Sequence, residues 1–371
     1  MPYCVQPFIN IRIDSDSEYK PCCHYKDSIP AQSVSEYLNS AELSKLQQHL
    51  LTDNPLPLGC QLCFKQESKQ QLSFRQRYND FFESATQTKI THLEMLVNNT
   101  CNLKCFMCDP AYSTALGSER KSLGWIESYP VINHKQQVTL AINELPDLKS
   151  VSFIGGEFFF SKDNIPLLEK AIERNLKIHI TTNATTLLPR HIDLLKQARE
   201  VDIQVSLDGI EDCYDFMRYP ATWTVVKDNI LLLKKTLPNQ CVHIHAVAQP
   251  LNIQYVAPLM EWCNKNLLKI AVVNLQAPSW LEWRILTTQE KTLISDVLDQ
   301  CSTAYHLTLE QKAILSQFKS AFSLIEFDQT FRNEFIKKMQ SIMTLRNISD
   351  NTVIKQFGVL SDLAQTIIEK T

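Results

Sequence analysis

The middle of the chain, residues 88 to 276, alternates six short apolar runs with longer segments of helical periodicity. The apolar runs, rich in β-branched residues, are typical of strands. They are "ITHLEMLVN", "SVSFI", "KIHITTN", "VDIQVSLD", "VHIHAVAQ" and "KIAVVNLQ", at residues 90–98, 150–154, 177–183, 201–208, 242–249 and 269–276. Segments such as "IPLLEKAIERN" lie between them and repeat apolar residues at intervals of three and four. This order predicts an α/β fold of six βα units with a parallel sheet, a barrel smaller than the eight-unit kind.

Three of these strands also carry polar side chains at a period of two, so each pair shares one face of its strand. The pairs are His92 and Glu94, Gln204 and Ser206, and His243 and His245. A packed eight-stranded barrel fills its interior chiefly with Val, Ile and Leu. If these faces point inward, the barrel encloses a wet cavity; if they point outward, they pack against helices with satisfied hydrogen bonds.

Composition excludes several classes of protein. The chain has 371 residues, 44% of them hydrophobic, and a formal net charge of -3. Such a chain can fill the cores of two or three domains, and it has no basic excess for nucleic acid or an anionic membrane surface. The N-terminus has no signal-peptide pattern, and no segment has about 18 uninterrupted apolar residues. We therefore expect a cytoplasmic protein with no nucleic-acid or membrane partner.

Twelve cysteines are present, and eight of them gather in two groups. In a cytosolic chain of this size, clustered cysteines more often hold metal than form disulfides. Five fall in the first 63 residues and three in "CNLKCFMCD". The remaining four are read as buried small hydrophobes: Cys213, Cys241, Cys263 and Cys301.

The stretch "CNLKCFMCD" places Cys101, Cys105 and Cys108 just after the first predicted strand. Parallel α/β folds build their sites at this carboxyl end of the strands. A cubane iron–sulfur cluster usually has four thiolate ligands, so three cysteines leave one iron open. A zinc site with a fourth protein ligand or a water is the alternative that spacing alone leaves open.

The three-cysteine motif resembles that of the radical S-adenosylmethionine (SAM) enzymes, and the resemblance extends over roughly residues 88 to 280. It implies a partial (β/α)6 barrel and a [4Fe-4S] cluster on Cys101, Cys105 and Cys108. In that family the open iron binds the amino and carboxylate groups of SAM, and reductive cleavage of SAM gives a 5'-deoxyadenosyl radical.

Further segments resemble the SAM contacts of the family. "FIGGEFFF" is similar to its GGE segment, which implies that Gly155, Gly156 and Glu157 receive the SAM ammonium; a simple tight turn is the alternative. "TTNAT" is similar to its Thr-Asn-Gly turn, with Ala184 in place of glycine, and makes Asn183 a candidate. "VSLDG" and "YDFMRYP" add Ser206 and Arg218 as contacts of the SAM ribose and carboxylate. Ser206 as a structural residue and Arg218 in a surface ion pair are the alternatives.

The N-terminal cysteines resemble the twitch, or half-SPASM, module of radical SAM enzymes, in a subgroup that carries it at the N-terminus. "CVQPFINIRID" and "EYKPCCHY" are predicted to form a hairpin, and "LGCQLCFKQE" adds a Cys-x-x-Cys pair. The resemblance implies an auxiliary [4Fe-4S] cluster on Cys4, Cys22, Cys60 and Cys63. Cys23 is then not a ligand, although spacing alone does not decide between Cys22 and Cys23. A structural zinc ion is the alternative to the auxiliary cluster.

We predict three domains: a twitch-like α+β module with a connector helix (residues 1–87), the radical SAM core (88–284) and a helical region (285–371). The last has helical patterns at 288–303, 308–324, 328–344 and 350–369 and no cofactor motif, so a cap, a substrate entrance and a dimer face all remain open.

The resemblance implies hydrogen abstraction from a substrate C–H bond and an electron donor such as flavodoxin or ferredoxin. Relatives with auxiliary clusters often modify peptides, which makes a peptide the leading substrate. A sugar, amino acid or nucleotide is the alternative substrate, and a metal-bearing adaptor without chemistry is the alternative from another class. The sequence does not indicate an oligomeric state or a catalytic side chain.

Overall fold

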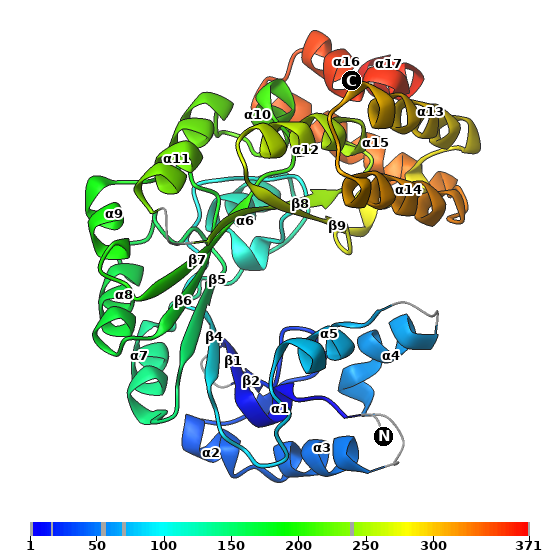
Figure 1. Cartoon of the computed structure of the whole chain (residues 1–371). Helices are drawn as coiled ribbons and strands as arrows, with labels where there is room; N and C mark the ends of the chain where they lie inside the picture. The colour runs from blue at the N-terminus through cyan, green and yellow to red at the C-terminus, as the bar shows by residue number, and fades with distance from the viewer. Residues whose placement is uncertain (1–2, 16–17, 53–56, 69–71, 238–240, 370–371) are drawn as a thin grey trace. The chain divides into compact units, whose positions relative to one another are not determined.

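The computed structural model describes residues 3–15, 18–52, 57–68, 72–237 and 241–369 (Figure 1). The chain divides into two compact units. The first comprises residues 1–100, 131–181 and 188–203, and the second comprises residues 101–130, 182–187 and 204–371. The boundaries of these two units differ from those of the three domains expected from the sequence. The three-domain division stays a prediction.

The first unit is built on a sheet in which an N-terminal hairpin adjoins the first barrel strands. The strand order is β3-β2-β1-β4-β5-β6-β7. β1 pairs antiparallel with β2 but parallel with β4, so the hairpin extends the parallel sheet through β1. The strands are β1 (Asn10–Ser15), β2 (Glu18–Lys20), β3 (Ile29–Pro30), β4 (His92–Leu96), β5 (Ser150–Ile154), β6 (Lys177–Thr182) and β7 (Glu200–Ser206), the last residues of β6 and β7 falling in the second unit.

The helices of this unit begin at side-chain caps where the sequence supplies them. Ser33, Ser40 and Ser73 each accept a hydrogen bond from the third helical residue. The helices are α1 (Gln6–Ile9), α2 (Val34–Leu38), α3 (Ala41–Leu51), α4 (Gln61–Ser68), α5 (Phe74–Phe81), α7 (Lys135–Glu144), α8 (Asn164–Glu173) and α9 (Pro189–Leu195). The predicted connector helix is therefore two short helices, α4 and α5.

The second unit contains the end of β7, β8 (Cys241–Ala248) and β9 (Lys269–Asn274), in the order β7-β8-β9, with β8 and β9 parallel. Its helices before the C-terminal region are α6 (Thr114–Ser122), α10 (Glu211–Met217), α11 (Trp223–Thr236) and α12 (Val256–Lys265). All six predicted barrel strands, β4 to β9, are found within two residues of their expected ends. The predicted α/β class with a parallel sheet is confirmed.

The C-terminal region is helical, as predicted, and packs into the core of the second unit. Its helices are α13 (Thr288–Ala304), α14 (Leu309–Ser323), α15 (Gln329–Arg346), α16 (Asp350–Phe357) and α17 (Ser361–Glu369). Phe106 from the three-cysteine loop shares one hydrophobic cluster with Trp280 and with Phe335 of α15. The ring centroids of Trp280 and Phe335 lie 6.0 Å apart. These helices and the loop are therefore parts of the same core.

The helix predicted for residues 350–369 is in fact two helices. Gly358 separates α16 from α17, and its φ of +50° lies in the left-handed region that side chains rarely adopt. A Cβ at this position would also collide with the side-chain amide of Gln254. Periodicity alone missed the break because the apolar pattern continues across it.

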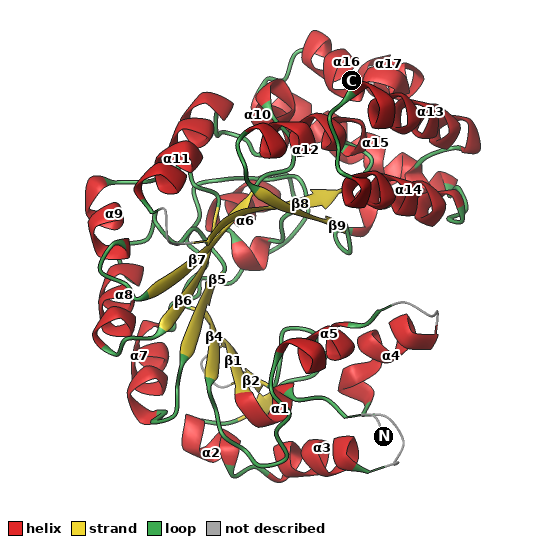
Figure 2. Ribbon diagram, in the orientation of Figure 1, coloured by secondary structure: helices red, strands yellow, loops and turns green. Residues whose placement is uncertain are grey.

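One face of the sheet is apolar and the other is polar. In β6, Ile178 and Ile180 are buried, whereas His179 between them is half-buried. Figure 2 shows α7, α8 and α9 together on one side of β4 to β7. The polar residues predicted to share a strand face are half-buried, whereas their apolar neighbours along each strand are mostly buried.

Candidate functional site

Cys101, Cys105 and Cys108 lie on one loop between β4 and a short 3-10 turn (Pro110–Tyr112). Burial raises the pKa of Cys108 far above its usual value, and the nearby thiols of Cys105 and Cys101 raise it further. Burial also raises the pKa of Cys105, while the positive charge of Arg218 opposes the increase. The three thiols thus share one short loop, and the thiols of Cys101 and Cys105 both contribute to the raised pKa of Cys108.

Asn183, predicted from the "TTNAT" turn, lies beside the first of these cysteines. Its Nδ2 is 3.9 Å from the sulfur of Cys101 and donates to Asn102 Oδ1 at 3.1 Å. Its Oδ1 accepts from both the backbone N–H and the hydroxyl of Thr185. These bonds fix the amide plane of Asn183 against the cysteine loop.

Ala184, the residue that replaces the expected glycine, adopts a left-handed conformation with φ of +56°. The turn expected of glycine is therefore present with alanine. Its N–H donates to Thr182 Oγ1 at 2.9 Å, and its carbonyl accepts from Asn229 at 2.8 Å. These two bonds hold a conformation that alanine rarely adopts without support.

Arg218, predicted from "YDFMRYP", lies at the second cysteine. Its Nη1 is 3.9 Å from the sulfur of Cys105, and its Nη2 forms an ion pair with Asp208 at 2.6 Å. Asp208 is fully buried and accepts a hydrogen bond from the N–H of Val247 at 2.8 Å. Arg218 is therefore a buried residue, and the alternative of a surface ion pair is wrong.

The Nε of Arg218 is buried and has no hydrogen-bond partner among the residues that the structure describes. Gln249, directly after β8, is fully buried, and both polar atoms of its amide lack a partner within the same set. Such groups are costly to bury unless a ligand or water satisfies them. The carboxyl end of the sheet in the second unit thus offers donors and an acceptor to a polar ligand.

The GGE segment belongs to the first unit, where it packs against the residues that precede Cys101 along the chain. Gly155 and Gly156 have φ values of +75° and +56°. A Cβ on Gly156 would lie 2.7 Å from the carbonyl oxygen of Thr100, so only glycine allows this approach. Glu157 is buried, its N–H donates to the same carbonyl at 2.8 Å, and its Oε1 accepts from the N–H of Phe159.

Ser206, the last residue of β7, is half-buried. Of the sequence-predicted SAM contacts, the second unit brings Asn183 and Arg218 to the cysteine loop. The GGE segment is described within the first unit only. The role of Ser206 stays a prediction.

The four N-terminal cysteines predicted as ligands all lie in the first unit. Cys4 packs with Leu46 and Leu50, and Cys60 lies against the same cluster. Burial raises the pKa of Cys60 to about 12, and the thiols of Cys4 and Cys63 contribute. Burial likewise raises the pKa of Cys22, with contributions from Cys23, Cys4 and Cys60.

Arg75 joins two of the segments that carry these cysteines. It donates to the carbonyl of Tyr3, the residue before Cys4, at 2.6 Å. It also forms a two-pronged ion pair with Glu67, which follows Cys63 in α4. A fork of this kind fixes both position and orientation.

Cys23 has different neighbours from Cys22. Its sulfur is 3.5 Å from the hydroxyl of Tyr78. The pKa of Cys23 is raised to about 11, chiefly by burial and next by the negative charge of Glu94. The hydrogen bond with Tyr78 and the positive charge of Arg12 act in the opposite direction. The side chain of Cys23 thus contacts Tyr78, whereas the thiols of Cys23, Cys4 and Cys60 all contribute to the raised pKa of Cys22.

Sequence reasoning missed three residues. Asp208 lies within "VSLDG", from which only Ser206 was nominated, and Gln249 is the last residue of a predicted strand. A polar residue at the carboxyl end of a buried strand is the signal that could have found both. The third, Arg346, lies in α15, and no motif marks it.

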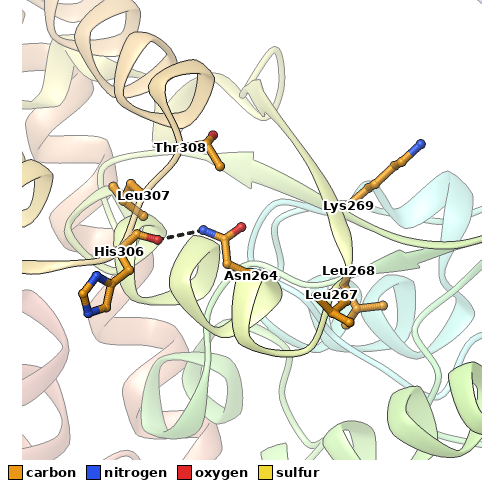
Figure 3. A pocket seen from close by; sticks show the side chains of 7 residues that line it. All are labelled: Asn264, Leu267, Leu268, Lys269, His306, Leu307 and Thr308. Carbon is orange, nitrogen blue, oxygen red and sulfur yellow. Dashed lines mark hydrogen bonds between the residues drawn. The ribbon is translucent and has the colours of Figure 1, made fainter.

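A pocket of about 660 Å³ in the second unit lies away from these residues. Figure 3 shows its lining, which includes Asn264, Lys269 and His306. Lys269 is the first residue of β9, so this pocket lies at the amino end of that strand. Sites in parallel α/β folds form at the carboxyl ends, and we assign no chemistry to this pocket.

The model of the Radical SAM superfamily matches residues 95–263. The matched segment begins in β4, ends in α12 and includes all three cysteines of the loop. The family model therefore matches the segment that carries the motifs on which the sequence prediction rests.

The GTP 3',8-cyclase of Geobacter sulfurreducens is 31% identical over 124 residues, which cover 33% of this chain and 35% of that protein. The chain thus matches about a third of the length of this curated relative. Similar solved structures include native anSMEcpe with bound AdoMet (19% identity, 56% of this chain, 59% of that chain, TM-score 0.42). SuiB of Streptococcus suis bound to S-adenosylmethionine is 16% identical and covers 64% of this chain and 47% of that chain, with a TM-score of 0.41.

None of the described helices has both the length and the apolar composition needed to cross a membrane.

Proposed function

We propose that this chain is a radical SAM enzyme that abstracts hydrogen from a peptide substrate. The observation that carries the proposal is the loop of Cys101, Cys105 and Cys108, with Asn183 and Arg218 at its sulfurs. The loop lies inside the segment matched by the superfamily model. When bound there, a [4Fe-4S] cluster supplies the electron that cleaves SAM to methionine and a 5'-deoxyadenosyl radical.

The residues around the loop suit these two cofactors. Three thiols on one loop leave an iron available to SAM. Arg218 has a buried Nε without a partner among the described residues, and a guanidinium binds a carboxylate well. We assign the SAM carboxylate to Arg218, the ammonium to Glu157 with the Gly155–Gly156 turn, and the ribose to Ser206.

We assign a second, auxiliary [4Fe-4S] cluster to Cys4, Cys22, Cys60 and Cys63. The apolar cluster that Cys4 and Cys60 share supports the set, and the contact of Cys23 with Tyr78 supports leaving Cys23 out. Four thiolates also satisfy zinc, so metal analysis is needed to choose. The proposed electron donor is a flavodoxin or ferredoxin, in keeping with the predicted cytoplasmic location.

Anaerobic incubation of reconstituted protein with SAM and a strong reductant tests the core of the proposal. We expect 5'-deoxyadenosine and methionine in equal amounts, and neither product from the Cys101→Ala, Cys105→Ala, Cys108→Ala variant. Equal, low product from both proteins would reject the enzyme and favour a metal-bearing adaptor.

A nucleotide substrate is the second candidate, because the curated relative matched by this chain is a GTP 3',8-cyclase. Deuterated peptides from the same cell and deuterated nucleotides separate the two. Only the true hydrogen donor transfers deuterium into 5'-deoxyadenosine. Transfer from a nucleotide alone would reject the peptide assignment while leaving the radical chemistry intact.

A further inference from the structure

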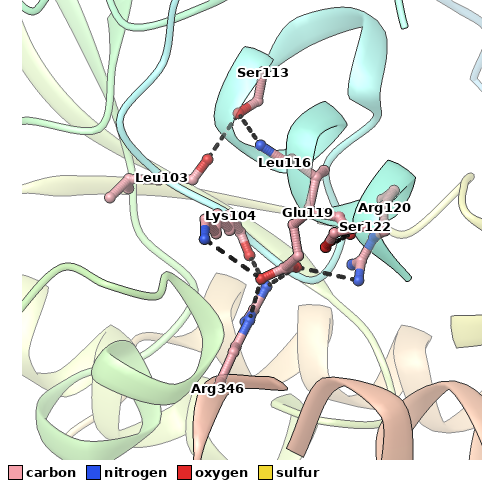
Figure 4. Close-up of polar contacts among 8 residues, drawn as sticks. All are labelled: Leu103, Lys104, Ser113, Leu116, Glu119, Arg120, Ser122 and Arg346. Carbon is pink, nitrogen blue, oxygen red and sulfur yellow. Dashed lines mark hydrogen bonds and ion pairs between the residues drawn. The ribbon is translucent and has the colours of Figure 1, made fainter. Parts of the chain in front are cut away.

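The backbone of the three-cysteine loop is held by groups from separate segments of the chain. Ser113 donates its hydroxyl to the carbonyl of Leu103 at 2.7 Å (Figure 4). The N–H of Lys104 donates to the carbonyl of Tyr219 at 2.7 Å, and that of Phe106 donates to Met217 at 3.2 Å. Buried backbone groups need such partners, so these bonds define the shape of the loop.

The carbonyl of Lys104, between the first two cysteines, accepts its bond from the C-terminal region. Arg346, the last residue of α15, donates Nη2 to this oxygen at 2.6 Å, across 242 residues of sequence. Its guanidinium lies 4.9 Å from the ring centroid of Phe106 and 4.8 Å from that of Tyr219. Arg346 thus contacts the loop both through a hydrogen bond and through stacking.

A buried acid orients Arg346. Glu119 of α6 accepts two hydrogen bonds from it, at 2.9 Å from Nε and 2.7 Å from Nη2, and both side chains are only 1% exposed. Two parallel bonds fix the plane of the guanidinium as well as its position. The pair therefore aims Arg346 at the loop.

Positive charge exceeds negative charge around Glu119. Arg120 lies 3.3 Å and Lys104 3.8 Å from its carboxylate, in addition to Arg346. Three cationic side chains thus surround one carboxylate. The Nη1 of Arg346 and the Nη2 of Arg120 are buried without hydrogen-bond partners in the described part of the chain.

We propose that Arg346 is a positioning residue for the cluster loop: it holds the carbonyl of Lys104 and places a buried cation beside the residue that precedes Cys105. The C-terminal helices are then part of the cluster site. The inference rests on the proposed cluster at Cys101, Cys105 and Cys108. A positively charged neighbour stabilises the more negative, reduced state of a cluster, and net charge is among the factors that set cluster potentials.

The experiment compares Arg346→Gln, Arg346→Lys and Glu119→Gln in a chain that also carries Cys60→Ala and Cys63→Ala, so that only the loop cluster is observed. The matched control is Arg332→Gln. Arg332 lies on the same helix, pairs with Glu290 at 2.7 and 3.0 Å and donates to the carbonyl of Ile285 at 3.1 Å. It has the same kind of contacts without touching the cysteine loop.

Iron retention against a chelator and the reduction potential of the cluster are measured beside thermal unfolding. We expect Arg346→Gln to weaken retention about 10- to 100-fold, the usual effect of losing an outer partner of a metal ligand. Its potential shifts to more negative values. Arg346→Lys restores most of the potential, since the charge returns, but not the retention, since the fork is lost. Glu119→Gln weakens the retention of iron but does not shift the reduction potential of the cluster to more negative values.

Arg332→Gln lowers the unfolding temperature but leaves both cluster measurements unchanged. Equal retention and potential in Arg346→Gln and Arg332→Gln would overturn the positioning role. If Arg346→Gln does not fold, unchanged retention in Arg346→Lys would overturn it instead. If the parent chain takes up no iron at the loop, the proposed function fails and this inference fails with it.

Discussion

The two groups of cysteines differ in how their thiols are supplied and in what surrounds them. The loop set takes three thiols from eight consecutive residues and has an amide and a guanidinium at its sulfurs. The N-terminal set takes four thiols from three separate segments and lies against an apolar cluster of Leu46 and Leu50. The two groups therefore differ in the number of thiols and in the polarity of their surroundings, although both are rich in cysteine.

Replacing the cysteines of each group in turn should have the largest effect on iron content and on SAM cleavage. The Cys101→Ala, Cys105→Ala, Cys108→Ala variant should lose all SAM cleavage, while about four of about eight irons remain. The Cys60→Ala, Cys63→Ala variant should lose the other half of the iron and still cleave SAM slowly without substrate. Iron and sulfide analysis with product chromatography measures both. Stoichiometric zinc in place of the second set of irons would contradict the auxiliary cluster.

The adjacent pair Cys22 and Cys23 sharpens the ligand assignment of the N-terminal set. Cys22→Ala should remove the auxiliary cluster, because its thiol is the one influenced by Cys4 and Cys60. Cys23→Ala should retain it, because its sulfur contacts Tyr78. The absorbance of each reconstituted variant at equal protein concentration is the measurement. Loss of the cluster in Cys23→Ala alone would reverse the assignment.

The ion pair of Arg218 with Asp208 is more deeply buried than that of Arg75 with Glu67, and this difference can be tested by mutation. Asp208→Asn should lower the free energy of unfolding by about 3–5 kcal/mol, because it leaves Arg218 charged and buried. Glu67→Gln, in the N-terminal region, should cost roughly 1 kcal/mol, since the Arg75 pair is partly exposed. Urea unfolding of the cluster-free proteins measures both, and equal costs would contradict the difference in burial.

The polar face of the first unit predicts a smaller, pH-dependent effect. Burial lowers the pKa of His92 from 6.5 to about 3, and His179 adds to the shift. Above pH 6.5 the folded and unfolded chains both carry this histidine neutral. Between pH 6.5 and 3 only the unfolded chain takes up the proton, so stability falls on acidification.

His92→Gln should therefore make the loss of stability less steep by roughly 1.4 kcal/mol per pH unit over this range. Urea unfolding at pH 6.5 and 5.0 measures the slope, with His49→Gln in α3 as the control for the same substitution elsewhere in the first unit. Identical slopes in the parent and His92→Gln proteins would show that His92 takes up its proton in the folded state.

The strands and the cysteine loop could be predicted from sequence because each is encoded by nearby residues. β5 is delimited by "SVSFI" itself, and the glycines at 155 and 156 mark the backbone approach to Thr100. Contacts between distant segments could not be predicted this way. The pair of Glu119 with Arg346 spans 227 residues, and neither residue belongs to a recognisable motif. The break at Gly358 was missed because helical periodicity is the same on both sides.

Parallel pairing of β1 with β4 has a consequence for the order of events during synthesis. Asn10 pairs with His92, and Ile13 with Met95. Because the ribosome makes β4 about 80 residues after β1, the hairpin has no neighbour on that edge until much of the N-terminal region has emerged. Cys4 is the first cysteine to be synthesised. The strand that follows it, β1, cannot pair with β4 until β4 is made, and β4 precedes the three-cysteine loop by only a few residues. The segment of Cys4 therefore gains its neighbouring strand only shortly before the three-cysteine loop is synthesised, although Cys4 and Cys101 lie almost 100 residues apart.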